Sequence, residues 1–154
     1  MYTLKASQFL PIGVNEAWEF FSSPKNLKVI TPPFMGFDIL SSLNGEEMYN
    51  GQIVTYRVRP ILNIPVTWVS ELKHINAPHY FVDEQKQGPY KVWHHQHFIQ
   101  ETDGGVIIRD EVNYKLPMGI LGKFAHWLFV RKQLNHIFEF RKKKLEELFA
   151  ATKK

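Results

Sequence analysis

The segment Tyr90–Gln100, with the sequence YKVWHHQHFIQ, holds the residues most suited to chemistry. If the segment is a strand, its side chains alternate between two faces, so His95 and His97 lie together on one of them. Two imidazoles in this arrangement can chelate a metal ion. A catalytic zinc ion also needs a third protein ligand, which Asp110 or Glu111 could supply. Histidines on a sheet are more often hydrogen-bonded or solvated, so we expect no metal ion and no other cofactor.

Asp110 belongs to the next segment, Val106–Leu116, in which apolar residues alternate with polar ones. It falls on the apolar face, which should point into the protein. A buried carboxylate without a partner is costly, so we expect a contact with His95 or His97 across the hairpin, or with Tyr114. The group could fasten the sheet, orient a carbonyl or hydroxyl group of a ligand, or transfer a proton in a cyclase-like reaction.

Trp68 lies in a third alternating segment, TWVSEL, and shares one face with Leu72. These two side chains should point inward, with Tyr56 and Val58 of the preceding segment as neighbours. An inward tryptophan more often packs a core than recognises a ligand, but in a protein with a cavity one ring does both.

Seven segments rich in β-branched and aromatic residues predict the strands that position these side chains. They are Tyr2–Leu10, Phe37–Leu43, Gln52–Arg59, Val66–Ile75, Tyr80–Gln87, Tyr90–Gln100 and Val106–Leu116. Turn sequences such as Asn44-Gly45 and Gly88-Pro89 separate most of them. Short linkers of this kind predict hairpins and therefore an antiparallel sheet.

Two short helices are predicted between the first and second strands. Asn15 is a good N-cap for the first, and Ser23 followed by Pro24 is a good start for the second. The sequence TPP at 31–33 must end the second helix, because proline disfavours the helical conformation in the residue before it.

From Gly119 onward, apolar residues recur at every third or fourth position, which predicts one long amphipathic helix. The residues expected to face the sheet are Leu121, Phe124, Leu128 and Phe138. The basic run Arg141–Lys144 is expected to be solvated. A helix of about 30 residues would be about 45 Å long, which suits a curved sheet that grips it. Helices in two places around contiguous strands indicate an α+β protein.

Length and composition exclude several classes. A chain of 154 residues suits one domain, 1–154, and the absence of cysteine excludes disulfides and thiolate chemistry. The net charge of +4 is small and partly local, and no phosphate-binding loop or nucleic-acid motif is present, so we expect no nucleic-acid partner. Neither a signal peptide nor a long apolar segment is recognisable, so we expect a cytoplasmic protein without integral membrane association.

Five sequence blocks occur in an order that resembles the START-like superfamily, also called SRPBCC. The blocks are ASQFLPIGVNEAWEFFSSPKNLKVITPP, TWVSEL, VDEQKQGPYKVWHHQHF, IIRDEVNYKLPMG and IFEFRKKKLEEL. They look like uncharacterised bacterial ligand-binding SRPBCC proteins related to polyketide cyclases, and like domains fused to epimerase-like proteins labelled cell-division inhibitors. The resemblance implies the helix-grip fold of the major birch-pollen allergen: a curved seven-stranded antiparallel sheet around a long C-terminal helix.

The resemblance and the aromatic content of 14% predict a cavity between sheet and helix that binds a lipid, quinone, polyketide or aromatic metabolite, as carrier or sensor. The residues expected to bind this ligand are Tyr56, Trp68, Trp93, His95, Asp110, Val112, Tyr114, Leu121, Phe124 and Leu128. One alternative is a cyclase- or dehydratase-like enzyme that uses Asp110 with His95 or His97. Another is a protein-interaction module.

Apolar segments such as PPFMGF would suit the mouth of the cavity or a transient contact with a membrane surface. The expected state is a monomer or a weak homodimer.

Overall fold

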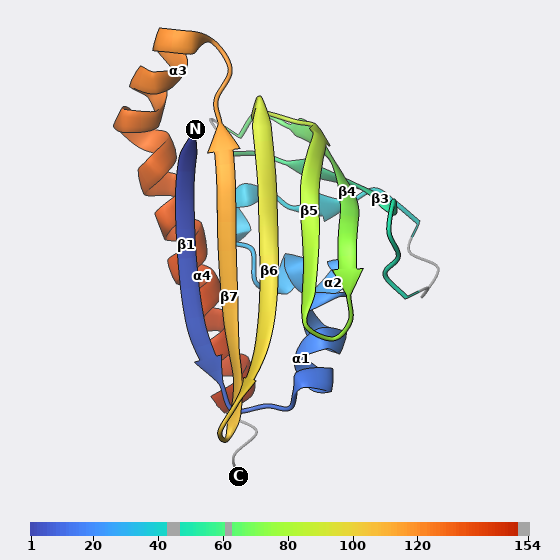
Figure 1. Ribbon diagram of the computed structural model, residues 1–154. Helices are drawn as coiled ribbons and strands as arrows, with labels where there is room; N and C mark the ends of the chain where they lie inside the picture. Colours follow the sequence, from blue (N-terminus) through green and yellow to red (C-terminus); the bar gives the residue numbers. More distant parts are fainter. Residues whose placement is uncertain (43–46, 61–62, 151–154) are drawn as a thin grey trace.

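The computed structural model describes residues 1–42, 47–60 and 63–150. Within these residues, seven strands form one antiparallel sheet in the order β1-β7-β6-β5-β4-β3-β2. The strands are β1 (Tyr2–Leu10), β2 (Asp38–Ile39), β3 (Ile53–Val58), β4 (Val66–Asn76), β5 (Tyr80–Gln87), β6 (Val92–Thr102) and β7 (Gly105–Lys115). Consecutive strands are neighbours from β2 to β7. β1 pairs with β7 over nearly its whole length, from Tyr2 opposite Tyr114 to Leu10 opposite Val106 (Figure 1).

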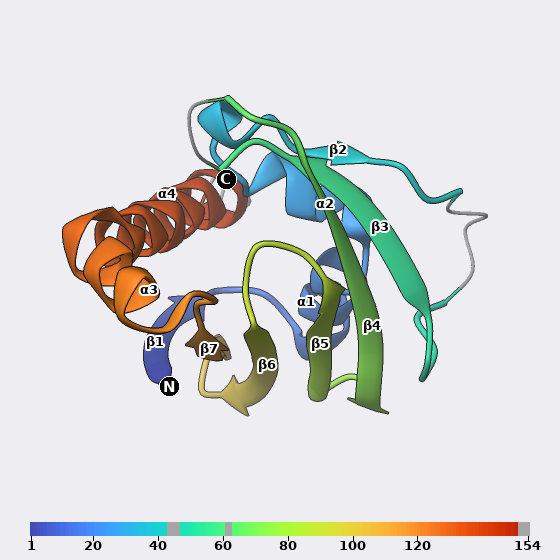
Figure 2. The same ribbon diagram turned by 90° about the horizontal axis from the view of Figure 1, so that it is seen from above.

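Helices occupy one side of the sheet. They are α1 (Val14–Phe21), α2 (Pro24–Val29), the 3-10 helix η1 (Pro33–Met35), α3 (Gly119–Ala125), the π-helical segment η2 (His126–Val130) and α4 (Arg131–Ala150). Figure 2 shows that the sheet curves from β1 to β2 and that α1, α2 and α4 lie within the curve. This arrangement is the predicted α+β helix-grip architecture, with a curved sheet around a long C-terminal helix.

The sheet buries one face because its apolar residues alternate along each strand. On β7, Val106, Ile108, Val112 and Tyr114 are buried, as is Asp110 between them. Ile108 packs with Leu145, in the second half of α4, in a cluster here called the lower core. Val112 packs with Val130 and Leu134, near the start of α4, in a cluster here called the upper core. Asp110 therefore lies between two apolar layers, as its position on the apolar face predicts.

Most predicted boundaries hold within two residues, but the second strand is an exception. Only Asp38 and Ile39 pair with β3, although a strand over Phe37–Leu43 was expected. The backbone N–H groups of Leu40 and Ser41 both donate to the carbonyl of Thr55, and the Ser41 hydroxyl accepts the N–H of Thr55. The side chain thus replaces a ladder bond and ends the strand early. The predicted turn at Asn44-Gly45 lies outside the described residues.

The two short helices form where expected, with one difference at the first N-cap. Gly13, rather than Asn15, is the N-cap of α1, and its carbonyl accepts the N–H of Ala17. Ser23 is the N-cap of α2 and Pro24 lies in its first turn, as predicted. None of the helices in the described part of the chain combines the length and apolar character needed to cross a membrane.

Candidate functional site

An apolar cavity of ≈190 Å³ lies between the curved sheet, the short helices and α4. Its walls come from every strand between β3 and β6 and from both α1 and α4. The aromatic residues among its lining are Phe20, Phe21, Phe37, Tyr56, Trp68, Phe81, Tyr90, Trp93 and Phe138. Its acidic and basic lining consists of Asp83, His95, His97 and Arg141. The cavity is therefore an apolar space with one polar wall.

Trp68, Trp93 and Tyr90 form an aromatic wall at one side of the cavity. The ring centroids of Trp68 and Trp93 are 5.2 Å apart with nearly perpendicular planes, and Tyr90 lies 4.8 Å from Trp93. The indole N–H of Trp68 donates to the Ser70 hydroxyl at 3.1 Å. Tyr56 is the cross-strand partner of Trp68, as the sequence predicts. Burial raises the pKa of Tyr56 and of Tyr90, so both phenols stay neutral at physiological pH.

The polar wall belongs to a group here called the His–Asp cluster, which consists of Asp83, His95, His97, Arg141 and Asp110. Asp110 lies behind the two histidines and does not itself line the cavity. His95 Nε2 lies 2.9 Å and His97 Nδ1 lies 3.1 Å from the same oxygen, Oδ1 of Asp110. On the other side of the rings, Asp83 Oδ2 lies 2.7 Å from His97 Nε2 and 3.3 Å from His95 Nδ1. Arg141 Nη2 is 3.4 Å from Asp110 Oδ1. Each imidazole therefore lies between two carboxylates.

The electrostatics of the cluster keep both carboxyl groups ionised. Burial alone would raise the pKa of Asp110, but Arg141 and the two imidazoles hold it well below its usual range. Burial acts on Asp83 in the same sense, and His95 and His97 outweigh it, so the pKa of Asp83 is also lowered. For His95, burial lowers the pKa, and the two carboxylates reverse that effect and raise it. The cluster is charged in a largely apolar surrounding.

Several sequence predictions meet in this cluster. Trp93, His95 and His97 share the inner face of β6, and Asp110 contacts both imidazoles across the hairpin. Glu111 lies on the outer face, where it pairs with Lys5 at 3.0 Å, so it cannot act as a ligand beside the two histidines.

The predicted alternative partner of Asp110, Tyr114, has a different contact. The Tyr114 hydroxyl lies 2.8 Å from Nε2 of His126, and the His126 ring stacks on Tyr2 with centroids 3.5 Å apart. Val112 and Tyr114 pack in the upper core with Val130, away from the lining of the cavity. They support the sheet beside the cavity.

The prediction that Leu121, Phe124 and Leu128 face the sheet is wrong. These side chains are 65%, 59% and 55% exposed. The residues of this stretch that are buried instead are Gly122, His126 and Val130, at steps of four. A π-helical turn holds more residues than an α-helical turn, so η2 rotates the residues of α3 relative to those of α4. The apolar stripe that faces the sheet along α4 therefore turns outward along α3.

Sequence reasoning missed two members of the cluster. Asp83 lies on β5, and its alternation with Phe81 and Gln85 could have placed it on the inner face. Its cross-strand partner is His95. Arg141 was assigned to a solvated basic run, but it is buried. Its spacing was the available signal, because it lies seven residues after Leu134 and four before Leu145, both buried.

Similar folds occur among solved structures. A START superfamily protein from Mycobacterium smegmatis matches with a TM-score of 0.70 and 12% identity over 99% of both chains. Ara h 8.0201, a Bet v 1-like allergen, matches with a TM-score of 0.60 and 11% identity over 95% of this chain and 98% of its own. A nucleoside-diphosphate sugar epimerase from Corynebacterium glutamicum matches with a TM-score of 0.67 and 23% identity, over 94% of this chain and 28% of the epimerase.

These similarities define the class of fold. The chain has the START-like helix-grip fold, which confirms the resemblance in the sequence at the level of the fold. No protein-family model and no curated protein sequence matches the chain.

Proposed function

We propose that this protein binds a hydrophobic small molecule in the cavity, as a carrier or sensor. The observation that carries the proposal is the cavity itself, in which aromatic and aliphatic side chains surround one polar wall. Ligand sites commonly combine a mostly apolar lining with a few polar groups that orient the ligand.

The apolar lining supplies the affinity in this proposal. Burial of about 300 Å² of apolar ligand surface at about 25 cal/mol per Å² contributes about 7 kcal/mol. Loss of translational and rotational freedom reduces this gain, so apolar burial alone supports a dissociation constant no tighter than about 10 μM, and tighter binding would need polar contacts.

Arg141 supplies the orienting contact. Its side chain lines the cavity, and its buried Nε atom has no hydrogen-bond partner among the described residues. A buried donor without an acceptor costs about 1–3 kcal/mol, and an oxygen atom of a bound ligand would remove that cost. We therefore propose that the ligand has a carboxylate, carbonyl or hydroxyl oxygen at one end of an apolar body.

The geometry favours binding over a cyclase-like reaction. A general base needs a free lone pair directed at the substrate. Both ring nitrogens of His95 and of His97 are directed at carboxylates of the protein, so neither ring aims a nitrogen at a substrate in the cavity.

We further propose that α3 and η2 make a transient contact with a membrane surface. The exposed apolar side chains of this segment and of the residue before it are Met118, Ile120, Leu121, Phe124, Trp127, Leu128 and Phe129. Between Glu111 and Glu139 the sequence holds four cationic residues and no acidic one. Apolar side chains with flanking cations suit the surface of an anionic bilayer.

The experiment that tests ligand binding is native mass spectrometry of protein purified from its own host, followed by denaturing extraction of whatever co-purified. A stoichiometric apolar molecule is the expected result. A cavity-filling variant, Ile137→Trp, should lose this molecule, whereas the control variant Ile120→Trp, at a position 83% exposed, should keep it. Equal retention in both folded variants would contradict the proposal.

A further inference from the structure

The His–Asp cluster contains three ligand atoms that converge on one point. These atoms are Asp83 Oδ2, His95 Nδ1 and His97 Nε2, and they lie within 4.8 Å of one another. The carboxylate oxygen is 3.3 Å from the first nitrogen and 2.7 Å from the second. Ligand atoms about 2.0–2.2 Å from a zinc-sized ion are themselves about 3 Å apart. These two distances are close to that value, and the three atoms are near enough to one another to share one ion.

Asp110 orients the two rings for this role. Its Oδ1 atom lies 2.9 Å from His95 Nε2 and 3.1 Å from His97 Nδ1, which are the nitrogens that face away from Asp83. A carboxylate accepts hydrogen bonds, so Asp110 can hold both rings through these nitrogens while the opposite nitrogens, which lie against Asp83, face the ion. A carboxylate behind each metal-binding histidine is the usual supporting arrangement at such sites.

The arrangement of the two rings also suits a cation. Both rings lie between Asp110 and Asp83, and their centroids are 3.8 Å apart. One divalent ion held between the two rings and Asp83 would contact both facing nitrogens and the carboxylate at once.

We propose that Asp83, His95 and His97 bind one divalent transition-metal ion, with Asp110 as the positioning residue. Two imidazoles and one carboxylate suit zinc, iron, cobalt or nickel better than magnesium or calcium. All three ligand residues line the cavity, so an oxygen atom of a bound molecule could complete the coordination. The site goes beyond the proposed binding of an apolar ligand, because the ion needs no ligand in order to bind.

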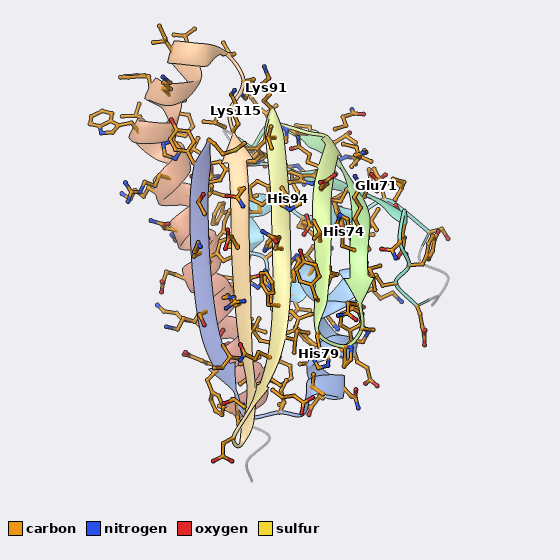
Figure 3. All side chains as sticks on the ribbon, in the orientation of Figure 1. Glu71, His74, His79, Lys91, His94 and Lys115 are labelled. Carbon is orange, nitrogen blue, oxygen red and sulfur yellow. The ribbon has the colours of Figure 1, made fainter. Side chains whose placement is uncertain are left out.

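The matched control lies on the same strand. His94 is on β6 between the inward-facing residues, but it projects from the outer face of the sheet, where its Nδ1 is 2.9 Å from Glu84 (Figure 3). His94 therefore has a carboxylate partner but no second histidine beside it, so it should not bind the ion.

The test is a titration of tag-free, chelator-treated protein with Co²⁺, followed by absorbance, and with Zn²⁺, followed by calorimetry. We expect one ion per chain with a micromolar or tighter dissociation constant. The variants Asp83→Asn and His95→Gln should weaken binding at least 100-fold, and Asp110→Asn about 10- to 100-fold. The control His94→Gln should change it less than 3-fold.

Nuclear magnetic resonance keeps the proposal testable if a variant fails to fold. In the unmodified protein, Zn²⁺ should shift the ring C–H signals of His95 and His97 and leave that of His94 unchanged. Absence of stoichiometric binding, or binding that moves the His94 signal instead, would overturn the metal site. Because the titration uses metal alone, its failure would leave the binding of an apolar molecule unaffected.

Discussion

The two ends of the C-terminal helical segment have opposite relations to the sheet. Along α4, Leu134, Arg141, Leu145 and Phe149 are buried. Along α3 and η2, most large apolar side chains are exposed, and Trp127 reaches 76%. In Figure 1, α4 runs behind β1 and β7, whereas α3 extends beyond the ends of these strands. An apolar stripe is therefore buried only where the sheet is long enough to cover it.

The comparison also separates two uses of an apolar surface. The face of α4 closes the cavity and supports the His–Asp cluster, so its residues determine stability and the interior of the site. The surface of α3 and η2 has no covering element among the described residues. Substitutions in α4 should therefore change the unfolding free energy, whereas substitutions in α3 and η2 should change binding to membranes.

The largest expected effect follows from Arg141 in α4. Replacement by methionine keeps much of the volume but leaves Asp110 without its guanidinium partner in a buried position. Loss of one partner of a buried ion pair costs about 3–5 kcal/mol of unfolding free energy, which urea denaturation would measure. Lys143→Met, two residues later on the exposed side of the helix, should change stability by less than about 0.5 kcal/mol. Similar values for the two variants would contradict the structural role of Arg141.

A matched pair of leucines gives the next largest effect. Leu145 is 2% exposed in α4 and Leu121 is 65% exposed in α3. Leu145→Ala should lower the unfolding free energy by about 2–5 kcal/mol, because it removes buried methyl groups and leaves a cavity. Leu121→Ala should remain within about 0.5 kcal/mol of the unmodified protein. Thermal and urea denaturation would measure both, and a cost above 2 kcal/mol at Leu121 would show that α3 is covered.

The exposed end predicts an effect on membranes that stability measurements would not detect. The double variant Phe124→Ala/Trp127→Ala should reduce sedimentation with anionic vesicles at least 10-fold, because it removes exposed aromatic surface. The unfolding free energy should stay within about 0.5 kcal/mol. Neutral vesicles serve as the control, since the flanking cations should favour the anionic ones. Equal sedimentation of the variant and the unmodified protein would exclude this surface as the contact.

The architecture could be predicted from the sequence because strand alternation and turn residues are local signals. Tyr2–Leu10 and Tyr80–Gln87 have the predicted bounds, and the inward faces of β6 and β7 are as expected. These faces predicted that Asp110 contacts His95, His97 or Tyr114, and the structure shows contacts with both histidines. Side chains alternate between the two faces of a strand, so the inward-facing residues can be assigned once the turns at both ends of the strand are recognised.

The rest depends on tertiary contacts that no local pattern contains. Arg141 looks like part of a solvated run until the carboxylate of Asp110 is placed beside it. The outward turn of Leu121 and Phe124 depends on the π-helical segment and on where the sheet ends. Asp83 joins the cluster through the pairing of β5 with β6, a register that the sequence alone does not fix.

The smallest predicted effect concerns His126, at the junction between the two ends of the helical segment. Burial, Arg131 and the N-terminal amino group lower the pKa of His126 below its ordinary value of 6.5. The unfolded chain therefore takes up a proton at a higher pH than the folded protein does. The associated stability is fully present above pH 6.5 and is lost as the pH falls from there toward the lower folded pKa.

His126→Asn should reduce this pH dependence. The unfolding free energy of the unmodified protein should fall more steeply between pH 7 and pH 5 than that of the variant, although the variant is less stable at pH 7 because Tyr114 loses its partner. Urea denaturation at several pH values would measure both slopes. Asn135→His offers a control histidine on α4, which should add no comparable slope if it remains solvated. Identical slopes for His126→Asn and the unmodified protein would mean that His126 takes up its proton over the same pH range folded and unfolded, and that this junction is open to water like the exposed end beside it.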